Sequence, residues 1–270
     1  MTGGSDRAVV LEVNDLHGGY THAPVLRGVS LSVARDEVVA LLGANGAGKT
    51  TVLRALSGSL PVCRGEIEMD GVALGRKPPW ERVKAGLCHV PEGRHVFASM
   101  TVRENLAVAA LVGPRTIGLG DVLEIFPRLA ERQGQLAGSL SGGEQQMLAI
   151  GRALMTSPSL LAIDEMSAGL APVLVEQLAG ALEKLRGRGV GILLVEQSPH
   201  FIADIVNRVY LLEHGRIVGE GTLDELGGAD RIGELYLGVA QTTAPEHDYA
   251  TEPLHQPGSD ATRGATDVQL

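Results

Sequence analysis

The chain has 270 residues, 44% of them hydrophobic and only 3% aromatic, which allows one large α/β domain or two small ones with an aliphatic core. The net charge is −9, and the last 30 residues hold five acids against one base, so the composition argues against broad nucleic-acid binding. No apolar run approaches the roughly 18 residues that a membrane span needs, and no apolar signal segment begins the chain. We therefore expect a cytoplasmic protein that acts at a membrane only through partner subunits.

The cysteines and histidines predict neither a disulfide framework nor a zinc site. Cys63 and Cys88 form no Cys-x-x-Cys pair, and the eight histidines are scattered. We expect both cysteines to be buried free thiols in a reducing compartment.

The pattern of apolar residues predicts strands that alternate with helices. Val9–Val13 and Val29–Val33 alternate apolar and polar residues, which indicates a small antiparallel region. Val38–Leu42 is a continuous apolar run that ends in glycine, as expected of a buried parallel strand, and Lys49–Leu56 follows as a helix. Further strands are predicted at Glu66–Met69, Leu87–Val90, Leu160–Ile163, Gly191–Val195, Val209–Leu212 and Gly215–Gly221.

Helical patterns separate these strands. The segment from about Thr101 to Ser139 reads as a separate helical lobe, and helices are also predicted at Gly142–Met155 and Leu174–Arg186. Alternating strands and helices imply a mainly parallel core sheet, so the predicted fold class is α/β. The residues from Gln241 onward lack apolar periodicity and are predicted to be a disordered acidic tail.

A glycine-rich segment after the Val38–Leu42 strand fits the phosphate-loop pattern G-x-x-x-x-G-K-[ST]. Its backbone N–H groups and the following helix N-terminus suit the phosphates of a nucleotide. Lys49 would reach the β- and γ-phosphates, and the Thr50 hydroxyl would bind Mg²⁺. The residues expected to contact the nucleotide are Gly43, Ala44, Asn45, Gly46, Ala47, Gly48, Lys49, Thr50 and Thr51. A glycine-rich turn without a ligand is the structural alternative.

Two acids follow the apolar run Leu160–Ile163. Asp164 would hold Mg²⁺, and Glu165 would polarise the attacking water as general base. The structural alternative is an ordinary acidic end of a strand.

A second anion-binding turn, Ser141-Gly142-Gly143-Glu144, opens the helix predicted at Gly142–Met155. One nucleotide does not need two such sites from one chain. The economical explanation is a dimer in which each chain's turn caps the nucleotide held by the other chain. A capping turn without a ligand is the alternative.

The order of these motifs resembles that of the ATP-binding cassette (ABC) ATPases from about Tyr20 to Gly221. The resemblance implies a P-loop ATP-binding domain over residues 8–240, with a helical lobe at about 101–140 and the tail at 241–270. It also implies that Tyr20 stacks on adenine, although an edge-strand tyrosine has the same pattern. Glu92 stands where most relatives carry glutamine, and could contact Mg²⁺ and the lytic water. Gln197 replaces the usual switch histidine, and its amide cannot become cationic; either could also be a plain polar strand end.

These departures resemble the LivF-type ATPases of branched-chain amino-acid importers. The segments that carry the resemblance are 90–94 (VPEGR), 195–197 (VEQ) and 167–172 (SAGLAP). The resemblance implies an ATP-hydrolysing motor with a second ABC ATPase, membrane permeases and, indirectly, an extracytoplasmic solute-binding protein. The alternatives are a urea or short-amide importer ATPase, a soluble ABC ATPase, and a regulatory subunit that does not hydrolyse ATP. The single nucleotide motif set and the acidic body argue against the soluble class.

Overall fold

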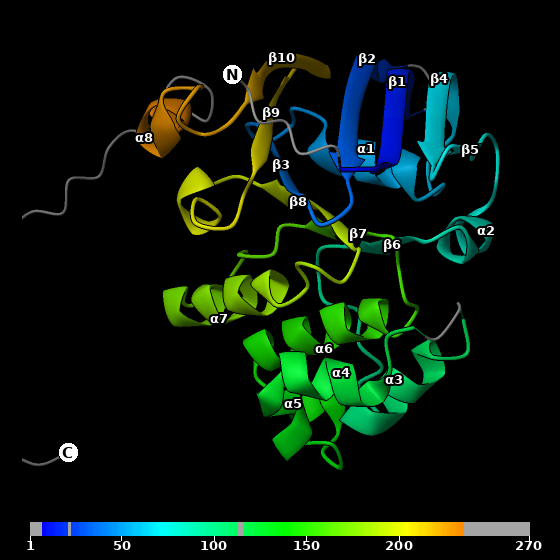
Figure 1. The fold of residues 1–270 in the computed structure, drawn as a ribbon, viewed down its shortest axis with the longest axis vertical. Helices are drawn as coiled ribbons and strands as arrows, with labels where there is room; N and C mark the ends of the chain where they lie inside the picture. The colour runs from blue at the N-terminus through cyan, green and yellow to red at the C-terminus, as the bar shows by residue number, and fades with distance from the viewer. Residues whose placement is uncertain (1–6, 21–22, 113–115, 235–270) are drawn as a thin grey trace, which may run out of the picture. The chain divides into compact units, whose positions relative to one another are not determined.

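The computed structural model describes residues 7–20, 23–112 and 116–234, which form two β-sheets and a group of helices (Figure 1). The strands are β1 (Val9–Tyr20), β2 (Ala23–Ala34), β3 (Val38–Leu42), β4 (Val62–Met69), β5 (Val72–Ala73), β6 (Leu87–Val90), β7 (Leu160–Asp164), β8 (Gly191–Glu196), β9 (Arg208–Glu213) and β10 (Arg216–Gly221). The helices are α1 (Lys49–Leu56), α2 (Pro79–Lys84), α3 (Val102–Ala109), α4 (Leu119–Ile125), α5 (Pro127–Glu131), α6 (Gly142–Leu154), α7 (Pro172–Glu183) and α8 (Gly228–Ile232).

The larger sheet has six strands in the order β10-β9-β3-β8-β7-β6. All neighbouring pairs are parallel except β9 with β10. Every residue of β3, β7 and β8 is buried, because helices or the second sheet cover both faces. This double burial explains the continuous apolar runs in the sequence. The predicted α/β class with a mainly parallel core sheet is confirmed.

The smaller sheet is antiparallel, in the order β2-β1-β4-β5, and covers one face of the larger sheet. Val39 and Leu41 of β3 pack with β1, β2 and α1. Val38, Ala40 and Leu42 point to the other face, in the apolar cluster that includes residues of helices α3 to α8. The period of two along β3 therefore divides the core into two apolar clusters.

Helices α3, α4 and α5 form the helical lobe and pack against α6 (Figure 1). Within the segment predicted to form the lobe, five apolar residues are at most 2% exposed: Leu106, Val122, Ile125, Phe126 and Leu129. Leu111 of the same segment lies beyond the end of α3 and is 77% exposed.

The chain enters and leaves the lobe through a short hydrogen-bonded neck. Thr101 and Leu136 form an antiparallel bridge. Ala137 N donates to Met100 O at 2.9 Å, and Gly138 N donates to Ala98 O at 3.0 Å. A Cβ on Gly138 would lie 3.0 Å from the Ala98 carbonyl oxygen. The close approach of the segments that enter and leave the lobe therefore favours glycine at position 138.

Three features differ from the sequence-based expectations. The β1–β2 hairpin is far longer than predicted, because register shifts along it break the alternation on which the prediction relied. Helix α2 was not predicted, and it is held by Arg82, whose guanidinium donates to the carbonyls of Ala55 and Leu56 at 2.9 and 2.7 Å. Cys88 is buried, as expected, but Cys63 is exposed because the outer part of β4 lies at the surface.

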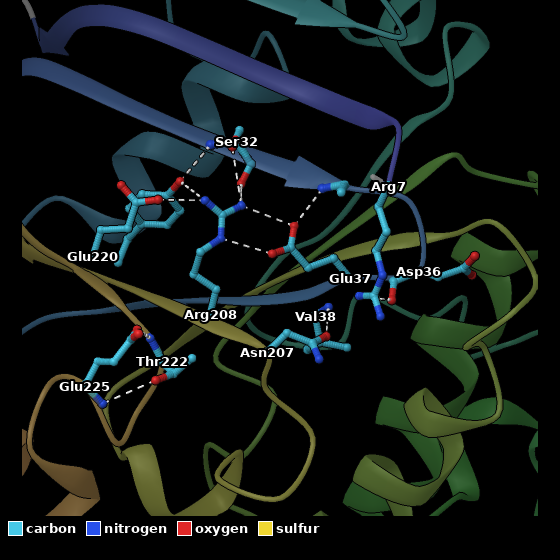
Figure 2. Close-up of polar contacts among 12 residues, drawn as sticks. Arg7, Ser32, Asp36, Glu37, Val38, Asn207, Arg208, Glu220, Thr222 and Glu225 are labelled. Carbon is cyan, nitrogen blue, oxygen red and sulfur yellow. Dashed lines mark hydrogen bonds and ion pairs between the residues drawn. The ribbon is translucent and has the colours of Figure 1, made fainter. Parts of the chain in front are cut away.

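Arg208 links the two sheets at the edge where β3 and β9 begin (Figure 2). Its Nε and Nη2 donate to the two carboxylate oxygens of Glu37 at 3.0 and 3.2 Å. Nη1 donates to Glu220 of β10 at 2.6 Å and to the Tyr210 hydroxyl at 2.7 Å, while Nη2 donates to Ser32 O of β2 at 3.0 Å. One side chain thus connects β2, β9 and β10 to the start of β3.

The predicted tail, 241–270, lies outside the described residues. No helix within the described ranges is both long enough and apolar enough to span a bilayer.

Candidate nucleotide-binding site

The glycine-rich segment is a loop between the end of β3 and the start of α1. Gly46 and Gly48 have φ values of 81° and 110°, which favour glycine. A Cβ on Gly43 would lie 2.4 Å from Leu212 O of β9, so this position also has no room for a side chain. Gly215 N donates to Ala47 O at 2.9 Å and holds the loop from the β9–β10 turn. The loop therefore has the strand–loop–helix context that phosphate binding requires.

Lys49 begins α1 and is 5% exposed. Its ammonium donates to Gly43 O at 2.7 Å and to Ala44 O at 3.2 Å, which draws the two ends of the loop around one cation. Burial lowers the pKa of Lys49, while the carboxylates of Glu165 and Asp164 act in the opposite direction. The lysine thus lies between the loop and the acids, as expected for a group that binds phosphates.

Asp164 and Glu165 lie where β7 ends, beside the loop. The Thr50 hydroxyl donates to Asp164 Oδ1 at 3.4 Å. Burial raises the pKa of Asp164, the Thr50 hydrogen bond lowers it, and the charges of Glu165 and Glu92 raise it further. Hydroxyl and carboxylate oxygens at such a position suit Mg²⁺, which prefers a few protein oxygens together with phosphates. Among the described residues no cluster of three or more His, Cys, Asp or Glu side chains could hold a metal ion alone.

Glu165 is held from the neighbouring strand β8. Its backbone has a φ of 46°, a left-handed conformation that is uncommon for residues other than glycine, and its N–H donates to Val195 O at 2.9 Å. The Gln197 side-chain amide donates to Glu165 Oε1 at 2.5 Å. Because β7 and β8 are parallel neighbours, the structure brings the predicted base and the predicted switch residue into direct contact.

Glu196 is a buried acid at this site that the sequence reasoning missed. It is 1% exposed, and it accepts hydrogen bonds from Ser167 N at 2.9 Å and from Ser167 Oγ at 2.7 Å. Burial raises its pKa, and the Ser167 hydrogen bonds oppose that shift. An acid at the end of the apolar run Gly191–Val195 was the available signal. Glu196 fixes the segment after Glu165 to the end of β8.

Glu92 lies in the loop after β6, at the same edge of the sheet. Together with Arg94, Gln145, Gln146 and Glu165 it lines a pocket of about 420 Å³. The charge of Glu92 also contributes to the raised pKa of Asp164. The three predicted acids of the site are therefore neighbours, although they come from two separate strand ends.

Ser141 is the N-cap of α6 and forms a capping box with Glu144. The Ser141 hydroxyl and N–H both donate to Glu144 Oε2 at 2.9 Å, and Arg132 Nε lies 2.7 Å from Glu144 Oε1. Gly142 and Gly143 follow in the first turn. In the described part of the chain no hydrogen bond or ion pair joins Ser141–Glu144 to Lys49 or Thr50. The turn does not complete the phosphate loop of its own chain.

Tyr20 ends β1 and is 45% exposed. Arg54 of α1 donates to its hydroxyl at 2.7 Å. The start of β2 lies at the loop, since Val25 Cγ1 would be 3.2 Å from a Cβ on Gly48. The hydrogen bond to Arg54 holds the tyrosine at α1 and leaves part of its side chain accessible.

A phosphate loop on a parallel sheet, with a helical lobe inserted between β6 and β7, is the architecture of the ATP-binding cassettes. The solved ADP conformation of MJ1267, an ATP-binding cassette of an ABC transporter, has a TM-score of 0.72 and 27% identity, over 80% of this chain and 92% of that one. The protein belongs to the ABC transporter family, whose model matches residues 26–168. It is an ATPase of that family, and such subunits work with membrane permeases.

Among relatives, the chain is 44% identical to BraG of Pseudomonas aeruginosa, a high-affinity branched-chain amino acid transport ATP-binding protein, over 81% of this chain and 95% of the relative. It is 34% identical to a probable branched-chain amino acid transport ATP-binding protein, LivF of Archaeoglobus fulgidus, over 85% and 99% of the two chains. It is 30% identical to the lipopolysaccharide export system ATP-binding protein LptB of Escherichia coli, over 84% and 97%. The resemblance to LivF-type ATPases is therefore confirmed.

Proposed function

We propose that the protein is the ATP-hydrolysing motor subunit of an importer for branched-chain or other hydrophobic amino acids. The observation that carries this proposal is the 44% identity to BraG, which extends over 95% of that relative. The lower identity to the lipopolysaccharide export protein LptB, 30%, favours the amino-acid importers over that export system.

In the proposed mechanism, the phosphate loop and Lys49 bind the triphosphate. Thr50, Asp164 and Glu92 supply oxygens for Mg²⁺, which would neutralise phosphate charge. Glu165 takes a proton from the attacking water. Gln197 orients Glu165, which is supported by the hydrogen bond between the two side chains. Tyr20 stacks on adenine with its accessible face.

The dimer is also part of the proposal. Ser141, Gly142 and Gly143 contact the γ-phosphate held by a second ABC ATPase subunit, which agrees with their lack of polar contact to Lys49 and Thr50 of the same chain. ATP stabilises the closed dimer, and hydrolysis releases it. The nucleotide thereby supplies the differential affinity that a conformational drive requires.

A groove beside the lobe supports the proposed permease contact. It has a volume of about 210 Å³, and its lining includes Val83 of α2, His89 of β6, His95 of the following loop, Ala109 of α3 and Arg152 of α6. A short permease helix docked there would touch both the lobe and the loop that carries Glu92. Closure of the dimer would then move that helix and switch the transport path. The extracytoplasmic binding protein would contact only the permeases.

The first experiment measures ATP hydrolysis by the purified chain, alone and with its co-encoded ATPase and permeases, with Glu165→Gln as the blank. We expect activity that appears or rises sharply only with the partners. In proteoliposomes, the assembled complex should accumulate leucine rather than urea when the binding protein is present. Full ATPase activity alone that no partner changes would contradict the transport role, and urea uptake would contradict the substrate class.

A further inference from the structure

The loop after β6 has an unusual backbone that turns its arginine toward α6. Gly93, Arg94 and His95 have φ values of 93°, 66° and 47°, so three consecutive residues adopt the left-handed region. This conformation is uncommon outside glycine, and surrounding contacts must hold it. Arg152 of α6 supplies one such contact by donating to His95 O at 2.6 Å, while its guanidinium lies over the Phe97 ring at 4.3 Å.

The Arg94 guanidinium occupies the space beside the first glycine of the signature turn, residues 141–143. A Cβ on Gly142 would lie 2.7 Å from Arg94 Nη1 and 2.8 Å from Nη2. A side chain at position 142 would therefore displace the arginine. The absence of a Cβ at Gly142 and the folded-back loop together place a cation at the N-terminus of α6.

Arg94 has no partner of opposite charge among the described residues. Within those residues its side chain forms no hydrogen bond and no ion pair. Of the nearby acids, Glu144 pairs with Arg132 at 2.7 Å and Glu165 accepts from Gln197. Glu92, which lines the same pocket, forms no ion pair with Arg94 within the described residues. Arg94 is also the sole basic residue among the described residues that line the 420 Å³ pocket.

The location makes this unpaired charge informative. The N-terminus of α6 already carries partial positive charge, so the nearby guanidinium of Arg94 is repelled by it. An anion that contacts both the helix N-terminus and the guanidinium would remove this repulsion. The capping box of Ser141 and Glu144 does not supply that anion to Arg94, because Glu144 is already paired with Arg132. An arginine held beside an anion-binding turn is suited to bind a phosphate group, because the phosphate oxygens can accept two hydrogen bonds from the guanidinium N–H groups.

We propose that Arg94 contacts the terminal phosphate of the nucleotide held by the opposite subunit, together with the signature turn of its own chain. The inference rests on the proposed role of residues 141–143. Arg94 would stabilise the negative charge of the γ-phosphate across the dimer interface, as arginines supplied in trans do in other P-loop NTPases. It would not act on the phosphate loop of its own chain.

The first test measures ATP-driven dimer formation by analytical ultracentrifugation, in the Glu165→Gln background and with the native partner subunit where the dimer is hetero. Arg94→Ala should raise the ATP concentration for half-maximal dimer about tenfold, and Arg94→Lys should recover part of the loss. Arg103→Ala is the matched control, because Arg103 is an exposed lobe arginine. Binding of a fluorescent ATP analogue to the monomer should be the same in all three variants. Because the Arg94 effect is electrostatic, it should shrink as salt concentration rises.

The second test asks which subunit's nucleotide Arg94 serves. Protomers that carry Lys49→Ala, which should be inactive alone, are mixed with protomers that carry Arg94→Ala at an ATP concentration too low for the Arg94→Ala dimer to form alone. A contact in trans predicts regained hydrolysis, since one site of the mixed dimer has both an intact Lys49 and an intact Arg94. If the chain pairs with a different ATPase, both substitutions go into this chain, and Arg94→Ala should remove the activity that Lys49→Ala leaves.

The outcomes separate this inference from the proposed function. If the unsubstituted chain forms no ATP-dependent dimer with any partner, the proposed function itself is wrong. If it dimerises and Arg94→Ala matches Arg103→Ala, the Arg94 inference is wrong. Absence of recovery in mixed dimers would also overturn it, because Arg94 would then serve its own chain's nucleotide. If Arg94→Ala does not fold, the same comparisons are made with Arg94→Gln, which keeps a polar side chain of similar reach but removes the charge.

Discussion

Replacing Arg208 with alanine should destabilise the fold without changing the nucleotide site. Arg208 is only 25% exposed, and Glu37, which accepts two of its hydrogen bonds, is 11% exposed. Removing one partner of a buried ion pair typically costs about 3–5 kcal/mol. Two features reduce the cost here: Glu37 keeps a hydrogen bond from Ala34 N at 2.8 Å, and Glu220 is 50% exposed and can be hydrated. We therefore expect a loss of about 2–3 kcal/mol in the free energy of unfolding.

Urea unfolding followed by far-UV circular dichroism measures this loss. Arg216→Ala is the matched control, since Arg216 opens the adjacent strand β10 and is exposed, and it should change stability by less than about 0.5 kcal/mol. Arg208→Lys should recover little, because an ammonium cannot reproduce the two-pronged contact with Glu37. ATP affinity should stay unchanged, because Arg208 lies at the edge where β3 begins and the phosphate loop follows the end of β3. A loss below about 1 kcal/mol would refute the view that Arg208 is a principal link between the sheets.

Three further predictions concern the site and its surroundings. Lys49→Ala should abolish ATP binding or hydrolysis, as measured by equilibrium binding and phosphate release, and wild-type turnover would refute its phosphate role. Gln197→His should hydrolyse ATP at an equal or faster rate than the wild type, and its rate should depend on pH between about pH 6 and 8 in a way that glutamine cannot produce. If the ratio of the Gln197→His rate to the wild-type rate does not vary with pH, residue 197 does not contact the reacting groups. Burial lowers the pKa of His89 from 6.5 to about 4, so the unfolded chain binds more protons between these values and stability falls as the pH drops. Between pH 7 and pH 5, His89 should lower the free energy of unfolding by about 2 kcal/mol. In urea titrations at the two pH values, the wild type should therefore lose about 2 kcal/mol more than His89→Gln does.

The elements most accurately predicted are those whose local pattern and buried environment agree. The runs at Val38–Leu42 and Leu87–Val90 were predicted with the bounds that the structure gives. The first is apolar throughout and is followed by a glycine, and the second is apolar except for His89 and is followed by a proline. The α1 helix was also predicted with its bounds, since the phosphate-loop pattern fixes where it begins.

The less accurate predictions depended on contacts between distant parts of the chain. The length of the β1–β2 hairpin is set by register shifts, and α2 is held by Arg82 bonding to the end of α1. The proximity of Gln197 and Glu165 follows from parallel pairing, but the hydrogen bond between them requires side-chain positions that a sequence does not give. The same is true of Arg94, which lies 48 residues before Gly142 in the sequence and reaches it only through folding.

The hydrogen-bonded neck at the base of the helical lobe suggests how related ATPases could acquire different lobes. The chain passes into and out of the lobe at adjacent points, where Ala98 and Met100 pair with Gly138 and Ala137. A segment whose two ends meet in this way can be exchanged as a block, because its replacement needs only the same end-to-end spacing. A different lobe, suited to a different membrane partner, could thus replace this one at the same two attachment points, while the strands and loops of the nucleotide-binding site remain unaltered.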